Sequence, residues 1–326
     1  MARTDNLNNY LTDIATAIKT KKGDSTPINA SNFDTEISNI PVAPTYPFDI
    51  TAYEIKKQNA TQQDIQDIAT WITNNSSYDV YIYTKNKASA FLGGTFTDAS
   101  ALDNKLKMKV VGGYDNQGGT DGAVFDSCSN MTRPPIIDFC CSSGLSKMFY
   151  GCSSLVSLPS NYFSTLRNSN DNYNILQPQL FTSTFEGCTS LTTLEGTQLN
   201  YMKPFYINKC FKNCSSLTTF PFTNLSNCGS MNNMCDGCTS LTDVPILTPS
   251  TWGRGVNVGS AFTNCPNLTQ TSVDNILNFL ANCTAISGGK KISRIFSNGY
   301  GYLTKVQNSS YYTNIVNAGW LIDITD

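Results

Sequence analysis

The chain has 326 residues, 40% of them hydrophobic and only 14% charged, with a formal net charge of −2 and no histidine. The low charge disfavours electrostatic binding to nucleic acid. A chain without histidine lacks the commonest general base and the commonest metal ligand. No apolar run reaches the roughly eighteen residues that span a bilayer, so we expect no nucleic-acid partner, no membrane insertion, no enzyme activity, no metal and no cofactor.

Residues 1–40 contain two short amphipathic segments. In the first, apolar residues recur at helical spacing and are followed by Lys19, Lys21, Lys22 and Gly23, as is typical of a helix C-terminus. A second short helix is expected near residue 33. Helices this short are marginal alone, so we expect them to pack on each other or on a partner within an oligomer.

The strings D-I-A-T-A-I-K-T-K-K-G at 13–23 and P-I-N-A-S-N-F-D-T-E-I at 27–37 resemble a small N-terminal module of phage tail proteins and other virion proteins of gut bacteria. The resemblance implies an attachment module that joins a distal domain to the particle. The candidate attachment residues are Leu7, Leu11, Ile14, Ile18, Phe33 and Ile37.

Residues 41–47, P-V-A-P-T-Y-P, form a stiff proline-rich linker. Residues 48–89 have a mixed pattern, which predicts a helix over Thr61–Trp71 and a strand over Tyr78–Tyr83. We expect this segment to be either an N-terminal cap for the repeats that begin near residue 90 or a small mixed domain.

A repeat of the form F-x-x-C-x-x-L fills residues 90–270, with 24 to 36 residues between successive cysteine slots. We align a degenerate copy over Phe96–Leu102, with Ala99 in the cysteine slot. The clear copies begin at Phe125, Phe149, Phe185, Phe211, Cys235 and Phe262.

Each copy continues with a second apolar residue and often a proline, which predicts a turn followed by a short L-x-x-L strand. One copy cannot bury its apolar side alone, so copies must stack with Phe, Cys and Leu inward. The residue before the cysteine is Gly in three copies (Gly151, Gly187, Gly237) and Asn in two (Asn213, Asn264). Both residue types tolerate positive φ, so this slot predicts a left-handed turn.

The form M-F-x-G-C-S-S-L-x-x-L-P at Met148–Pro159, repeated in related form at Cys210–Pro221 and Met234–Pro245, closely resembles the BspA-type leucine-rich repeat. The resemblance implies a parallel-stranded solenoid with a role in binding or adhesion, as in bacterial surface, protist and phage virion proteins. The expected fold is an α+β repeat protein: a leucine-rich-repeat-like solenoid with a small N-terminal helical module and a C-terminal helical cap.

Four cysteines have spacing that suggests a thiolate zinc site: Cys210, Cys214, Cys235 and Cys238. They occupy repeat slots that hold Phe, Met, Ala or Cys in other copies, which favours packing as small buried hydrophobes. Disulfides are disfavoured because we expect folding in the cytoplasm. Cys140–Cys141 is off register, and its pattern suggests no function.

Residues 271–326 show helical periodicity over Ser272–Leu280 and again over Tyr311–Trp320, where the chain reads N-A-G-W. This arrangement resembles the closing segment that follows such repeats in phage and gut-bacterial proteins. It predicts a helical cap over the last repeat, with Trp320 in the core of the cap.

Insertions between copies usually carry the recognition surface of a repeat protein. We expect deletion of Asn161–Asn174 to impair adsorption while leaving thermal unfolding nearly unchanged. The candidate receptor-binding residues are Asn161, Tyr162, Tyr173, Tyr201, Tyr206, Trp252 and Arg254.

The leading hypothesis is a bacteriophage virion protein of a tail fibre, baseplate or head fibre. Its partners would be other virion proteins and a host-surface glycan or protein, and it would be a homo-oligomer, with a trimer as the usual form of a projecting fibre. The alternative is a bacterial cell-surface adhesin with BspA-type repeats. A secretory signal would favour that alternative, and the first residues show no apolar stretch of that kind.

Overall fold

The structure, a computed structural model, describes residues 49–51, 54–56, 58–75, 80–84, 91–110, 123–141, 145–164, 179–197, 199, 202–253, 255–283, 292 and 295–326. They belong to one compact unit, Phe48–Asp326. No helix among them has the length and apolar composition needed to cross a membrane.

The predicted attachment module at 1–40 and the linker at 41–47 lie outside the described residues. The same holds for the six candidate attachment residues Leu7, Leu11, Ile14, Ile18, Phe33 and Ile37.

Two strands and a helix begin the described chain: β1 (Asp49–Thr51), β2 (Glu54–Lys56) and α3 (Gln62–Asn74), followed by β3 (Tyr81–Thr84). The hydroxyl of Thr61 accepts the Asp64 backbone N–H and the Asp64 carboxylate accepts the Thr61 N–H, which is a capping box. The predicted helix and strand are confirmed, with bounds shifted by a few residues.

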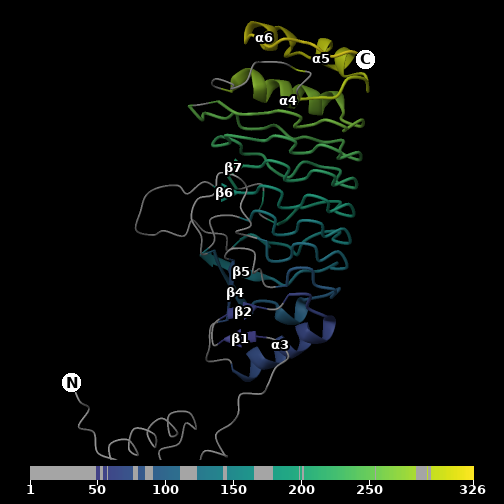
Figure 1. Ribbon diagram of the computed structural model, residues 1–326. Coiled ribbons are helices and arrows are strands. Elements are labelled where there is room, and N and C mark those ends of the chain that lie inside the picture. The colour runs from purple at the N-terminus through teal and green to yellow at the C-terminus, as the bar shows by residue number, and fades with distance from the viewer. Residues whose placement is uncertain are drawn as a thin grey trace, which may run out of the picture. The chain divides into compact units, whose positions relative to one another are not determined.

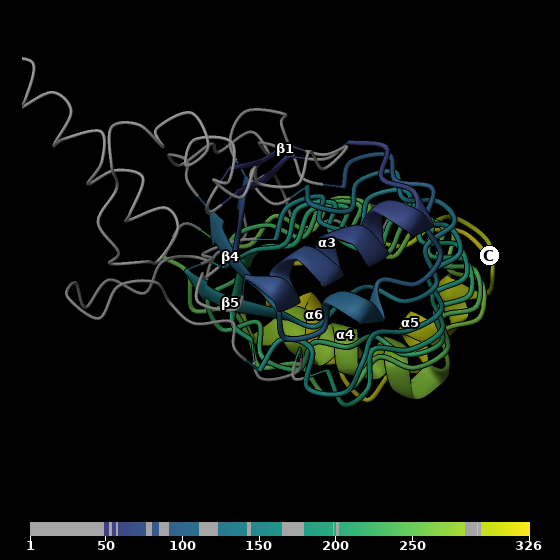
Figure 2. The ribbon, with the colours of Figure 1, turned by 90° about the horizontal axis from the view of Figure 1, so that it is seen from below.

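Helix α3 lies across the N-terminal end of the stacked turns (Figure 2) and buries Ile65, Ile68 and Trp71 against them. The first residue of α3, Gln62, also hydrogen-bonds the backbone of the first copy at this end. The side-chain Oε1 of Gln62 accepts the N–H groups of Thr97 and Asp98 at 3.1 Å, and its Nε2 donates to the Asp98 carbonyl at 2.7 Å. The Gln62 side chain thus satisfies backbone groups that a neighbouring strand would otherwise bond.

Two sheets lie beside the turns. The larger has the order β1-β2-β3-β4-β5, antiparallel between β1 and β2 and parallel from β2 onward. Its remaining strands are β4 (Leu106–Val110), which follows the short 3-10 helix η2 (Ser100–Leu102), and β5 (Ile137–Cys141). The smaller pairs β6 (Gln179–Leu180) in parallel with β7 (Pro204–Tyr206).

Successive copies of the repeat lie directly on one another (Figure 1). In the copies from Phe125 to Phe262, the N–H of the Phe-slot residue donates at 2.8–2.9 Å to the carbonyl of the residue just before that slot in the next copy, as Phe149 does to Thr184. The rings of Phe91, Phe125, Phe149, Phe185 and Phe211 stack with centroids 5.3–5.8 Å apart. We call this column the Phe ladder; its members are fully buried.

The cysteines form a second inward column beside the Phe ladder. Each thiol donates to the carbonyl of the Phe-slot residue in the preceding copy at 3.0 Å, as Cys188 does to Phe149. Of the cysteines whose side chains are described, nine are fully buried, among them the four that suggest a zinc site. Their burial and register agree with the interpretation of these cysteines as small core residues.

The first copy is aligned differently from the prediction. Phe91, not Phe96, stacks on Phe125, and its carbonyl accepts the Cys128 thiol. Phe96 instead occupies the leucine slot. The carbonyl of the following residue, Thr97, accepts the N–H of Thr132, just as the carbonyl of Val156, which follows Leu155, accepts the N–H of Thr192. The copy is one residue shorter, so the aligned pattern F-x-x-A-x-x-L was wrong.

The predicted left-handed slot before the cysteine is confirmed, with φ between 54° and 83° in all five residues and in Ser127 of the first clear copy. A second left-handed slot lies two residues before the Phe slot in the copies that begin at Phe149, Phe185, Phe211, Cys235 and Phe262, and it was not predicted. Its residues have φ between 53° and 60°, although two of them are lysines. They are Lys147, Ser183, Lys209, Asn233 and Ser260.

The L-x-x-L segments form isolated parallel bridges, such as Thr219 with Asp243, where continuous short strands were predicted. The fold past residue 270 also differs from expectation. Phe262 forms a parallel bridge with Phe296, and its N–H donates to the Ile295 carbonyl at 2.9 Å. One further partial copy therefore follows the first C-terminal helix.

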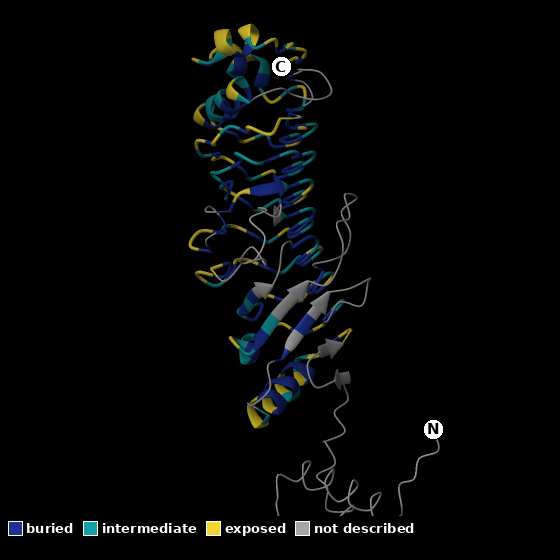
Figure 3. Cartoon of the chain, turned by 90° about the vertical axis from the view of Figure 1, so that its left-hand side faces the viewer, coloured by how far each residue is buried: buried dark blue, intermediate teal, exposed yellow. Residues whose placement is uncertain are grey.

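Three helices close the C-terminal end: α4 (Gln270–Asn282), α5 (Tyr302–Gln307) and α6 (Tyr312–Asn317). The helices predicted over Ser272–Leu280 and Tyr311–Trp320 are confirmed. Their inner faces are buried and their outer faces exposed (Figure 3), and Trp320 is buried.

Candidate functional site

The structure separates the predicted receptor-binding residues into four groups. Tyr173, Tyr201 and Arg254 lie outside the described residues. Asn161 is exposed, in a left-handed turn whose N–H donates to the Gly196 carbonyl at 2.6 Å. Tyr162 is buried, and Tyr206 and Trp252 come together.

Tyr162 is a correction to the prediction. Its side chain is 1% exposed and its ring meets those of Phe139, Phe149 and Phe163 at 5.1–6.0 Å. Burial raises the pKa of its hydroxyl well above the ordinary value. A residue at the base of an insertion has therefore folded back into the core, so a deletion that begins at Asn161 would remove core packing and destabilise the chain.

Tyr206 and Trp252 belong to one aromatic cluster through Phe205. The Phe205 and Trp252 centroids are 4.6 Å apart at 86°, and the Phe205 and Tyr206 centroids are 4.5 Å apart at 71°. Edge-to-face geometry of this kind is favourable for aromatic rings. Phe205 is 7% exposed whereas Trp252 is 38% exposed. We call these three residues the Trp252 cluster.

Three successive stacked segments hold the cluster in place. The Gly229 N–H donates to the Phe205 carbonyl at 2.9 Å, and the Asn257 N–H donates to the Gly229 carbonyl at 3.1 Å. Parallel bridges join Tyr206 to Ser230 and Ser230 to Asn257. The cluster therefore lies on hydrogen-bonded backbone rather than on a free loop.

Gly229 makes room for the contact between the two larger rings. A Cβ built there would lie 3.3 Å from the Phe205 ring and 3.6 Å from Cδ1 of Trp252. The first distance is tighter than nine in ten real Cβ contacts, so a side chain here would require the Phe205 ring to shift by a few tenths of an ångström. Glycine lets both rings pack over this backbone without that shift.

The turn that carries Trp252 is fixed to the preceding copy. The Ser250 hydroxyl donates to the Cys228 carbonyl at 2.7 Å and accepts the Trp252 N–H at 3.3 Å. The Thr251 N–H donates to the Ser226 carbonyl at 2.9 Å. The indole is thus presented by a turn whose two preceding residues are hydrogen-bonded to the previous copy.

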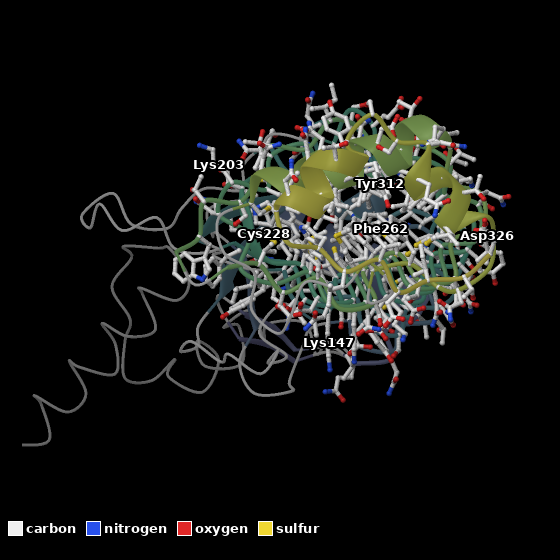
Figure 4. All side chains as sticks on the ribbon, turned by 90° about the horizontal axis from the view of Figure 1, so that it is seen from above. Lys147, Lys203, Cys228, Phe262, Tyr312 and Asp326 are labelled. Carbon is white, nitrogen blue, oxygen red and sulfur yellow. The ribbon has the colours of Figure 1, made fainter. Side chains whose placement is uncertain are left out.

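The described segments around the cluster carry little charge, and Arg254, two residues after Trp252, lies outside the described residues. Ile246 in these segments is 70% exposed. Lys203 carries the one charge among the described residues of the segments 202–208, 222–232, 245–253 and 255–259. Exposed polar side chains nearby in sequence are Thr251 and Asn257. Figure 4 shows Lys203 at the rim of the stack, on a different side from Lys147, while Cys228 and Phe262 lie inside.

The hydroxyl columns on the outer surface form a second regular feature. Ser153, Thr189, Ser215 and Thr239 each donate at 3.3 Å to the carbonyl of the residue in the same slot of the preceding copy. Their protons are already used within the stack, so these columns join copies to each other.

The thiols of Cys128 and Cys228 offer no nucleophile at neutral pH. Burial raises the pKa of each to about 12, so both stay protonated and act as donors. In the described part of the chain, no three Cys, Asp or Glu side chains lie close enough together to hold a metal ion.

Phe205 and Gly229 were missed by the prediction, which treated the insertions as loops that leave the stack. The structure shows that parts of the insertions stack as well, so Phe205 and Gly229 lie in neighbouring segments. The only signal in the sequence is an aromatic pair after Pro204, which does not reveal its contact with a residue some fifty positions later.

Comparison with known proteins adds no name to this arrangement. No protein-family model matches the chain, and no curated protein matches it either. A functional proposal must therefore rest on the repeat, on what its residues resemble, and on the geometry of the Trp252 cluster.

Proposed function

We propose that this chain is a structural protein of a bacteriophage particle, in a tail fibre, baseplate or head fibre, that contacts the host surface. Residues 90–270 would be its solenoid of BspA-type leucine-rich repeats. The observation that carries the binding role is the Trp252 cluster, in which an exposed indole is held on a hydrogen-bonded scaffold.

A rigid, exposed aromatic ring suits recognition for physical reasons. Aromatic residues dominate the centres of binding surfaces because they bury a large area with few rotatable bonds. A ring that is already held in place loses little further freedom on binding. The hydrogen bonds around Ser250 and Gly229 supply that pre-organisation.

The remaining parts of the proposal follow from resemblance. Residues 1–40 would attach the chain to other virion proteins, with the apolar positions of its two short helices as the contacts. The chain would be a homo-oligomer, and a trimer if it forms a projecting fibre.

Mass spectrometry and immuno-electron microscopy of purified particles test the assignment. The protein should be present in the virion, and antibodies raised against it should label a tail, baseplate or head appendage. Label on the bacterial envelope and none on particles would contradict the proposal and support a surface adhesin.

Adsorption competition tests the binding role separately. Purified chain, added in excess, should slow adsorption of the phage, and the Trp252→Ala variant should compete less well. Tyr150→Ala is a matched control, because Tyr150 is another exposed aromatic, 37% exposed, in a turn of the repeat. Equal competition by wild type and Trp252→Ala would show that binding lies elsewhere.

A further inference from the structure

We propose that the Trp252 cluster binds a neutral carbohydrate, with one sugar ring lying against the exposed part of the Trp252 indole. This inference names the ligand class of the surface and rests on the proposed role in host binding. It is carried by the shape, exposure and charge of one small group of residues.

The exposed indole indicates a ligand with an apolar face. An aromatic ring has a negative face, which attracts the weakly positive C–H groups on one side of a pyranose. Trp252 is 38% exposed, whereas the other two tryptophans, Trp71 and Trp320, are 9% and 3% exposed. The ring is therefore partly open to a ligand and partly supported by Phe205.

The neighbouring polar groups suit hydroxyls. The Thr251 hydroxyl donates to the Ser226 carbonyl at 3.2 Å, so its oxygen can accept a hydrogen bond from a sugar hydroxyl. Asn257 is exposed in the next stacked segment and its amide can donate and accept. Such groups match the alternating donors and acceptors around a sugar ring.

Charge decides between ligand classes. An anionic sugar, a nucleic acid or an anionic lipid surface would call for several cations. The described segments around the cluster contain one, Lys203, and Arg254, two residues after Trp252, lies outside the described residues. A protein partner of standard affinity needs a buried area of roughly 800 Å² on each side with an apolar core, and the exposed large apolar side chains described in these segments are Trp252 and Ile246. A neutral sugar needs neither feature.

The test uses changes in tryptophan fluorescence and its quenching by acrylamide. These changes should come mainly from Trp252, because the other two tryptophans are buried away from ligand and quencher. The full chain would be titrated with hexasaccharides of a glucan, a mannan, a galactan and a rhamnan, with oligogalacturonate as the charged comparison. At least one neutral hexasaccharide should shift the emission and protect the fluorescence from acrylamide. Oligogalacturonate should do so more weakly.

Variants separate the site from the fold. Trp252→Ala should weaken binding, measured by calorimetry, by about ten-fold or more, as loss of one stacking contact implies. Trp252→Phe should retain part of the affinity, and Tyr150→Ala should change it by less than roughly two-fold. Circular dichroism should show all three variants folded.

Two results would overturn the inference: no response to any neutral hexasaccharide at millimolar concentration, or binding that Trp252→Ala leaves unchanged. They differ from failure of the proposed function. If Trp252→Ala weakens adsorption competition while no sugar binds, host binding stands and the carbohydrate assignment fails. If a sugar binds at Trp252 and the protein is absent from particles, the carbohydrate assignment stands and the virion assignment fails.

Discussion

The Phe ladder and the Trp252 cluster are both aromatic groups built across stacked copies, yet they differ in geometry and exposure. Rings in the Phe ladder lie nearly parallel, at 7–13°, and are fully buried. Rings in the cluster meet at 71–86°, and one of them is open to solvent. Repetition places identical side chains in identical surroundings, so it builds a core. A site arises where the insertions break that repetition.

Loss of a ring from the Phe ladder should lower the free energy of unfolding more than any of the changes that follow. Phe149→Ala removes a ring that stacks on both Phe125 and Phe185, and truncation of a buried Phe costs about 3–5 kcal/mol. Denaturant unfolding of the chain should show a loss of that size. Trp252→Ala, at the exposed cluster, should lower the free energy of unfolding by less than half as much. Comparable losses at both positions would show that the cluster is also core.

Alkaline pH should lower the free energy of unfolding through the buried cysteines, which is the second largest effect that we expect. The pKa of Cys128 and of Cys228 is about 12 in the folded chain against 9.0 for a free thiol, chiefly because of burial. Between these values the unfolded chain loses protons that the folded chain keeps, so stability is full below pH 9 and falls as pH rises toward 12. The urea midpoint should decrease across this window.

Replacement of a thiol tests the cause of that decrease. Cys128→Val removes one titrating group while keeping an apolar side chain, so the fall in the urea midpoint between pH 9 and 12 should become shallower. The same slope in wild type and variant would mean that the alkaline loss arises from groups other than the thiols.

A substitution at Gly229 should sharpen the comparison by disturbing the cluster alone. Gly229→Val places side-chain atoms where Phe205 and Trp252 now pack, and overpacking of this kind costs about 1–3 kcal/mol. Trp252 should become more accessible to acrylamide. Gly253→Val is the matched control, since a Cβ at Gly253 has no neighbour within 4 Å. Equal quenching in both variants would contradict the role of Gly229.

The smallest effect concerns Asp236 on the turn surface. Burial raises its pKa, but hydrogen bonds from Lys212, Thr263 and Asn264 outweigh burial and leave the pKa below 3.8. Stability from this group is therefore present above the ordinary pKa and is lost as pH falls through the lowered one. Asp236→Asn should flatten the acid side of the stability profile by roughly 1 kcal/mol, the upper end for surface ion pairs, because the Asp236 side chain is only 14% exposed.

Local features were predicted well where the cause is local. The helices over 61–71 and 272–280 follow from apolar spacing, and the left-handed turn before each cysteine follows from Gly and Asn. The second left-handed slot went unseen because Lys147 and Lys209 give no such signal. Their conformation is imposed by backbone hydrogen bonds to the next copy, such as Lys209 N–H to the Asn232 carbonyl at 2.8 Å.

The sequence by itself determined which side chains face inward, because Phe, Cys and Leu recur at fixed spacing and one copy cannot bury them alone. Only the tertiary structure decided which residues of each insertion pack against the stacked copies. It buried Tyr162, placed Phe91 rather than Phe96 in the ladder, and brought Phe205 against Trp252. These outcomes depend on contacts between residues far apart in the chain, and no local spacing encodes them.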